Sequence, residues 1–187
     1  MNSKIAPRDF WSKQEIIPVV VIDSIDEAVP LAKKLIANSM ARIEITLRTK
    51  AALGAIEKIR TEVPEAMVGA GTIVNAQNYQ DALSAGAQFL VSPGSTPEIR
   101  QLFGDAPVPT LPGCATVSEA MELSNLGFEV AKFYPAMESG GVATLKAFAS
   151  VLPNLGFCPT GGLTASNYRE FLALPNVVCV GGSWVTK

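Results

Sequence analysis

Short apolar runs rich in β-branched residues alternate along this chain with amphipathic segments of helical period. The apolar runs predict strands over residues 17–22, 42–47, 67–72, 88–92, 108–111, 130–134, 156–160 and 177–180. The segments between them predict helices over residues 25–37, 50–62, 76–85, 97–103, 117–126, 142–152 and 165–172. Residues that favour helix N-caps stand near five of these starts: Thr49, Asn75, Thr96, Thr116 and Thr164.

Strands that alternate with helices are typical of a parallel α/β protein. The count of eight strands favours a closed TIM (β/α)8 barrel over an open sheet, with residues 1–187 forming a single domain. We expect an extra N-terminal helix near residues 8–15 to close the bottom of the barrel. Only seven residues follow the last predicted strand, so the helix expected after it is missing.

Composition narrows the class of protein. Of the 187 residues, 48% are hydrophobic, which suits one domain with a large core, and the formal net charge is −2. No basic run suggests nucleic acid as a partner, and no apolar stretch reaches the roughly 18 residues that a bilayer span needs. The N-terminus lacks the apolar region of a signal peptide. We therefore expect a cytoplasmic protein with no nucleic-acid or membrane partner.

The absence of histidine restricts the chemistry further. It excludes Ser-His-Asp and Cys-His catalysis and most zinc sites, so we expect no metal and no cofactor. The three cysteines, Cys114, Cys158 and Cys179, form no C-x-x-C pair and are expected to be reduced. Any general acid or base must be Glu, Asp, Lys, Tyr, or water that they hold.

Lys132 is the only charged residue in the run Val130-Ala131-Lys132-Phe133-Tyr134-Pro135-Ala136-Met137. A lysine in an apolar strand is costly to bury unless it has a partner or loses its proton. A neutral amine condenses with carbonyl groups to form a Schiff base. The alternative is a structural lysine that extends its ammonium group to solvent at the end of a strand.

Glu44 is the only acidic residue within the eight predicted strands. The two-residue period of strand two places Ile43, Ile45 and Leu47 against helices, and Arg42, Glu44 and Thr46 inside the barrel. An inward carboxyl group near a neutral lysine would suit proton transfer. Glu44 could instead serve only as an ion-pair partner for Arg48 or Arg42.

Glycines follow the last two predicted strands, in Pro159-Thr160-Gly161-Gly162 and Gly181-Gly182-Ser183. Barrels commonly bind phosphate in the loops after strands seven and eight, through consecutive backbone N–H groups. Each Gly or Pro taken alone is also explained by turn geometry. The two pairs together predict a phosphate site.

Six motifs occur in order along the chain: Glu44-Ile45-Thr46-Leu47-Arg48-Thr49, Gly69-Ala70-Gly71-Thr72, Ser92-Pro93-Gly94, Lys132-Phe133-Tyr134-Pro135-Ala136, Cys158-Pro159-Thr160-Gly161-Gly162 and Gly181-Gly182-Ser183-Trp184. Together they resemble the class I aldolases that cleave 2-keto-3-deoxy-6-phosphogluconate (KDPG), grouped with the 4-hydroxy-2-oxoglutarate (KHG) aldolases. The resemblance covers essentially the whole chain.

The resemblance implies a role for each matching residue. Lys132 would be the Schiff-base lysine and Glu44 the general acid/base. The substrate-binding residues would be Arg48, Thr72 and Pro93 at the pyruvate carboxylate, Gly161, Gly162 and Ser183 at the phosphate, and Tyr134 and Thr160 beside them. The products would be pyruvate and glyceraldehyde 3-phosphate, and the assembly a homotrimer.

The chain departs from the family's usual residues at Tyr134, where Phe is common, and at Arg42, which replaces an apolar residue. Asn38-Ser39 also stands where the family often has glycines. Other substrates stay open, namely KHG and the galactonate epimer of KDPG. Rival classes are a phosphosugar isomerase or epimerase and a non-catalytic sugar-phosphate-binding barrel.

Overall fold

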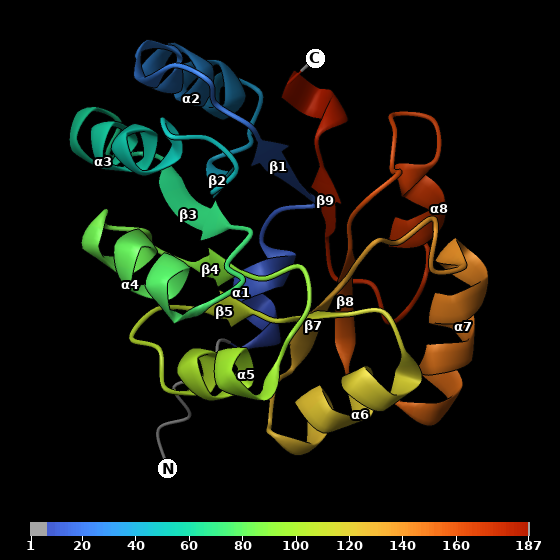
Figure 1. The fold of residues 1–187 in the computed structure, drawn as a ribbon. Helices are drawn as coiled ribbons and strands as arrows, with labels where there is room; N and C mark the ends of the chain where they lie inside the picture. Colours follow the sequence, from blue (N-terminus) through green and yellow to red (C-terminus); the bar gives the residue numbers. More distant parts are fainter. Residues whose placement is uncertain (1–6, 187) are drawn as a thin grey trace.

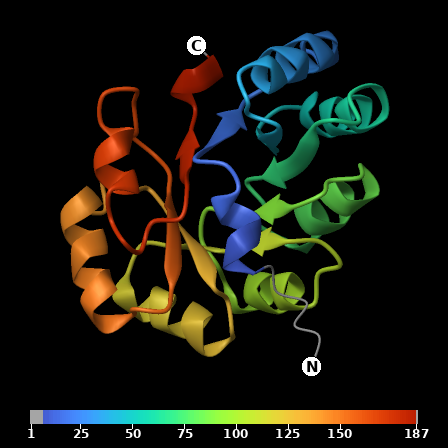
Figure 2. The same ribbon diagram turned by 180° about the vertical axis from the view of Figure 1, so that it is seen from behind.

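The structure is a computed structural model, and it describes residues 7–186. The helices form an outer ring around the strands (Figures 1 and 2). The helices are α1 (Arg8–Ser12), α2 (Ala28–Ala37), α3 (Ala52–Glu62), α4 (Ala76–Ser84), α5 (Pro97–Gly104), α6 (Val117–Asn125), α7 (Gly141–Val151) and α8 (Tyr168–Leu172), with 3-10 turns η1 (Ile25–Glu27) and η2 (Trp184–Thr186).

In the part of the chain that the structure describes, nine strands lie inside this ring, and every pair that is hydrogen-bonded is parallel. They are β1 (Ile16–Val20), β2 (Arg42–Thr46), β3 (Met67–Gly71), β4 (Leu90–Val91), β5 (Thr110–Leu111), β6 (Gly113–Cys114), β7 (Val130–Phe133), β8 (Gly156–Pro159) and β9 (Val180–Gly182). Each of the eight predicted strands overlaps or adjoins one of these, and β6 is an additional short strand. After β9 the only described element is η2.

The closed eight-stranded TIM barrel predicted from the sequence is wrong. The strands form two sheets, a six-stranded one in the order β5-β4-β3-β2-β1-β9 and a three-stranded one in the order β6-β7-β8. The first break falls between β5 and β6 at Pro112, which has no backbone N–H to donate to a ladder.

The second break falls between β8 and β9, which are joined only by isolated bridges at Phe157–Val177 and Thr160–Gly181. From the first bridge to the second, the β8 segment advances three residues and the β9 segment advances four. The register of the two segments therefore shifts by one residue between the bridges. Pro159 also lies in this interval and cannot donate a hydrogen bond. A continuous ladder cannot form there.

Helix starts follow the expected chemistry where a side chain reaches the first turn. Asn75, Thr96 and Thr116 accept hydrogen bonds as N-caps, and Thr116 forms a capping box with Glu119. Helices α3 and α8 instead have caps that make no side-chain bond, so Thr49 and Thr164 are not N-caps. Thr49 donates its hydroxyl to the carbonyl of Ile22.

Helix α1 covers one end of the strands of the two sheets, and Figure 2 shows it lying across the middle of that end. Its Trp11 is 1% exposed and packs edge to face on Phe89, with ring centroids 5.8 Å apart. The other members of this inner apolar cluster come from the strands and their extensions: Ile17, Val91, Leu111, Val130, Cys158 and Cys179. Apolar side chains therefore fill this end of the sheets. A site is expected at the opposite, C-terminal ends of the strands.

Among residues 7–186, no helix is both long enough and apolar enough to cross a bilayer.

Candidate active site

Glu44 on β2 and Lys132 on β7 form a buried ion pair between the two sheets. Oε1 of Glu44 lies 3.2 Å from Nζ of Lys132, and the two residues are 3% and 5% exposed. Glu44 therefore pairs with Lys132 and not with Arg48 or Arg42, the partners that the sequence left open. The Lys132 amine faces this carboxylate in the interior and does not extend to solvent.

The strand pattern places Glu44 as expected. Ile43 and Ile45 pack in the outer core with the helices, and Glu44 lies between them on the inward face. Gly71 on the neighbouring strand β3 makes room for it, because a side chain at that position would overlap the carboxylate of Glu44. Packing against Glu44 thus explains why the last residue of the Gly69-Ala70-Gly71 motif is glycine.

Arg42 stands apart from this pair, although it lies on the same face of β2. Its guanidinium carbon is 4.5 Å from the ring centroid of Phe10 in α1, and its Nε donates to Sδ of Met67 at 3.5 Å. Within the described chain, Nη1 is buried and has no hydrogen-bond partner. Burial lowers the pKa of Arg42, because removal from water disfavours the charged form.

Arg48 and Thr72 come together at the ends of β2 and β3. Nε of Arg48 donates to Oγ1 of Thr72 at 3.3 Å. Thr72 has φ of 64°, a left-handed conformation that is costly for a β-branched residue. Strained backbone of this kind gathers at functional sites, where the surrounding structure holds it in place.

A cavity of about 150 Å³ opens at the same ends of the strands. Six predicted site residues line it: Arg48, Tyr134, Thr160, Gly161, Gly162 and Ser183. The other four predicted residues, Glu44, Thr72, Pro93 and Lys132, do not line it directly. The ring of Tyr134 connects the two groups, because its centroid is 5.6 Å from Nζ of Lys132.

Gly161 and Gly162 adopt φ of 100° and 75°, which favours glycine. Between residues 7 and 186, their backbone N–H groups donate to no acceptor. Asn167 holds the loop by donating from Nδ2 to the carbonyl of Gly162 at 3.3 Å. Two adjacent N–H groups beside the hydroxyl-bearing Ser183 suit an oxyanion.

Comparison with known proteins fits this geometry. The family model for KDPG and KHG aldolases matches residues 9–187. This chain belongs to the KDPG and KHG aldolase family. The enzyme is therefore an aldolase, and aldolases are lyases.

Two curated relatives show how near the match is. The 2-dehydro-3-deoxy-phosphogluconate aldolase of Pseudoalteromonas atlantica is 45% identical over 184 residues, covering 98% of this chain and 86% of the relative. The KHG/KDPG aldolase of Escherichia coli (strain K12) is 43% identical over 184 residues, with the same coverage of 98% and 86%.

Among solved structures, the KDPG aldolase of Legionella pneumophila superposes with a TM-score of 0.93 at 42% identity, covering 97% of this chain and 88% of the other. That protein was captured at low pH with pyruvate as a covalent carbinolamine intermediate. A carbinolamine is the adduct that precedes a Schiff base.

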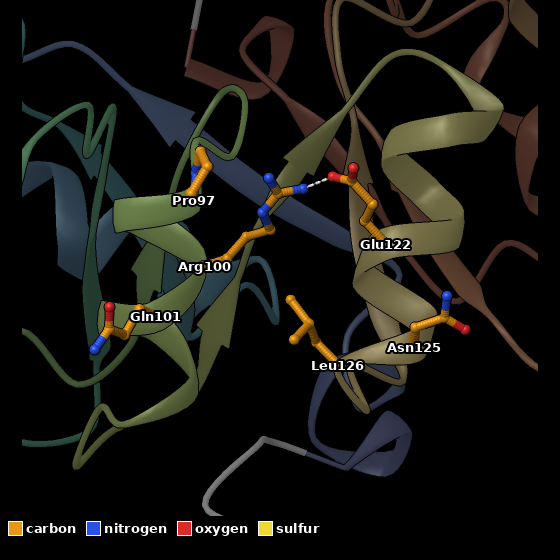
Figure 3. A pocket seen from close by; sticks show the side chains of 6 residues that line it. All are labelled: Pro97, Arg100, Gln101, Glu122, Asn125 and Leu126. Atoms are coloured by element: carbon orange, nitrogen blue, oxygen red, sulfur yellow. Dashed lines mark ion pairs between the residues drawn. The ribbon is translucent and has the colours of Figure 1, made fainter.

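The aldolase also has a larger cavity, of about 520 Å³, between α5 and α6 (Figure 3). Arg100 reaches across it to an ion pair with Glu122, and Pro97, Gln101, Asn125 and Leu126 complete its lining. No predicted site residue lines this cavity, and neither does any lysine. It lacks the amine that Schiff-base chemistry needs.

Sequence reasoning missed three residues of the smaller cavity as site residues: Val19, Leu163 and Gly181. Gly181 stood within a quoted motif, and its lack of a side chain leaves space for Thr160. Val19 and Leu163 are apolar residues, and nothing in the sequence distinguishes them from residues of the core. In the described part of the chain, no cluster of three or more His, Cys, Asp or Glu side chains could hold a metal ion.

Proposed function

We propose that this aldolase cleaves KDPG to pyruvate and glyceraldehyde 3-phosphate through a Schiff base on Lys132, with Glu44 as the proton carrier. The observation that carries the proposal is the buried contact of 3.2 Å between Nζ of Lys132 and Oε1 of Glu44. A carboxylate at this distance can take a proton directly from the amine or return one to it.

The reaction begins when the neutral Lys132 amine attacks the keto carbon C2 of the substrate. The carbinolamine gains a proton on its hydroxyl and loses water, which gives an iminium ion. Glu44 supplies and takes up these protons. When the C4 hydroxyl loses its proton, the C3–C4 bond breaks and its electron pair moves toward the iminium nitrogen. Glyceraldehyde 3-phosphate leaves, and the enamine that remains is protonated at C3 and hydrolysed to pyruvate.

Substrate binding is divided between two groups of residues near the ends of the strands. Arg48 with Thr72 supplies a cation and a hydroxyl for the pyruvate carboxylate, and Pro93 forms a rigid apolar wall. Gly161, Gly162 and Ser183 bind the phosphate through backbone N–H groups and a hydroxyl. Tyr134 and Thr160 line the same cavity as the phosphate-binding residues.

KHG is a second candidate substrate, because the E. coli relative is named for both compounds. It carries no phosphate, so it would need the amine, the carboxylate site and the proton carrier but no phosphate site. The unpaired N–H groups of Gly161 and Gly162 favour the phosphorylated substrate.

Borohydride reduction in the presence of pyruvate tests the proposal. The expected result is one stable pyruvate adduct per chain, mapped by peptide mass spectrometry to Lys132. Lys132→Arg should form no adduct, because a guanidinium group gives no neutral amine near pH 7. An adduct on Lys146 or Lys50 of the unmodified protein, or none, would refute the assignment.

The proposal extends to a homotrimer, as the family resemblance implies, and light scattering of the purified protein would measure its mass. It also extends to a cytoplasmic location, which cell fractionation would test.

A further inference from the structure

Two serines in the loop after β4 form hydrogen bonds with the backbone N–H and the backbone carbonyl of Gly113. The N–H of Gly113 donates to Oγ of Ser92 at 3.3 Å, and Oγ of Ser95 donates to the carbonyl of Gly113 at 2.9 Å. Ser92 is 0% exposed, and its own N–H donates to the carbonyl of Leu111 at 3.2 Å. We call this arrangement the serine clasp, defined as Ser92 and Ser95 on Gly113.

The serine clasp lies at the break between the two sheets. In a parallel strand, alternate residues direct their backbone groups to the neighbour on one side or the other. The carbonyls of Pro112, just before β6, and of Cys114 in β6 accept from the N–H groups of Lys132 and Tyr134 at 2.9 and 3.0 Å. The groups of Gly113 therefore point away from β7. Two side-chain hydroxyls bind them where the backbone of another strand would otherwise pair.

Gly113 is the register partner of Lys132. Gly113 also touches the loop directly, because a side chain there would overlap the backbone carbonyl of Pro93. The serine clasp thus fixes the loop that carries Pro93 against the strand that adjoins Lys132.

We infer that Ser92 and Ser95 are positioning residues, which set the placement of the Lys132 amine relative to the Pro93 wall across the break between the sheets. This inference rests on the proposed function, since its readout is the reaction of Lys132 with pyruvate. Without the hydroxyls, the edge of β6 has no backbone ladder to hold it and the N–H of Gly113 is left buried and unpaired. A misplacement of an attacking group by about 1 Å can cost on the order of 100-fold in rate.

The test compares the rate of borohydride trapping with pyruvate, and kcat for KDPG, in Ser92→Ala, Ser95→Ala and Ser95→Thr. Ser95 is half-buried, so threonine can retain the hydroxyl there without a change of fold. We expect the two alanine variants to lose about tenfold or more in both rates, and Ser95→Thr to recover most of the loss. Inhibition by inorganic phosphate should stay unchanged, since among the described residues no hydrogen bond joins the Gly161-Gly162 loop to the clasp.

Thr144→Val is the matched control. It removes a hydroxyl group in the first turn of α7 that donates a 2.8 Å hydrogen bond to the carbonyl of Ser139. Its trapping rate should match that of the unmodified protein, whatever its melting temperature. The inference is overturned if both alanine variants trap pyruvate at the unmodified rate per folded molecule, or if Ser95→Thr is as slow as Ser95→Ala. If the unmodified protein itself gives no adduct at Lys132, the proposed function fails, and the role of the clasp fails with it.

Discussion

Oε1 of Glu44 lies 3.2 Å from Nζ of Lys132, although 88 positions separate the two residues in the chain. The contact joins the six-stranded sheet to the three-stranded one. A carboxylate at this distance can move protons or can only balance the charge of the amine, and a substitution at Glu44 distinguishes the two roles.

Glu44→Gln keeps the shape and polarity of the side chain but cannot exchange a proton. We expect kcat to fall about 100-fold or more while circular dichroism shows a folded protein. Glu62→Gln, at an exposed carboxyl group at the end of α3, is the control and should keep full activity. A Glu44→Gln enzyme that is less stable yet nearly as active per folded molecule would show that Glu44 is only structural.

Ser183→Ala should weaken the binding of phosphorylated substrate selectively. The loss of one hydrogen bond is worth about 1 kcal/mol, so KM for KDPG should rise roughly fivefold. Cleavage of KHG, which has no phosphate, should be nearly unchanged. Equal losses with both substrates would remove Ser183 from the phosphate site.

A substitution at Gly162 would be a poorer test of the same site. Gly162 has φ of 75°, and a side chain there would lie 2.5 Å from Cγ of Met137. The loop would be strained whether or not it binds phosphate.

Arg42→Met should leave the protein as stable as before or more so. The substitution removes a buried donor without a partner, worth about 1–3 kcal/mol, and loses a contact with Phe10 worth about 0.5–1 kcal/mol. Urea unfolding should therefore show a gain of roughly 1 kcal/mol, with activity unchanged. The exposed Arg60→Met is the control, and a clear loss of stability in Arg42→Met alone would show that the guanidinium is stabilising.

Burial raises the pKa of the Cys114 thiol from 9.0 to about 12, and nearby Glu119 adds to the effect. The folded protein keeps this proton when the unfolded chain loses it. The resulting stability is present below pH 9 and is lost as pH rises toward about 12. We expect the free energy of unfolding to fall by up to about 1.4 kcal/mol per pH unit in this range. Cys114→Ala should remove that part of the slope, and an identical slope in both proteins would contradict the assignment.

The positions of the elements could be predicted because local patterns decide them. The alternation in β2 identified the inward face of Glu44, and the cap residues Asn75, Thr96 and Thr116 marked true helix starts. The closure of the sheet could not be predicted in this way. It depends on hydrogen bonds between distant segments, and these are interrupted at Pro112 and by the register slip between β8 and β9.

Of the two interpretations of Glu44, the one beside the neutral lysine had the right partner, and the one drawn from neighbours along the strand did not. Arg42 and Arg48 are close to Glu44 in sequence, but Arg42 packs under Phe10 and Arg48 binds Thr72. The spacing of residues along one strand does not predict which side chain of the other sheet faces a given residue.

The break at Pro112 divides the chain so that neither part holds all the residues of the proposed site. Glu44, Arg48 and Thr72 precede it, whereas Lys132, Tyr134 and the Gly161-Gly162 loop follow it. The last strand, β9, then crosses back to pair with β1 at the start of the chain. With the proposed residue roles, catalysis requires the two halves to be in register. Turnover would report their assembly during synthesis on the ribosome, since no activity can begin before the C-terminal half has emerged and docked.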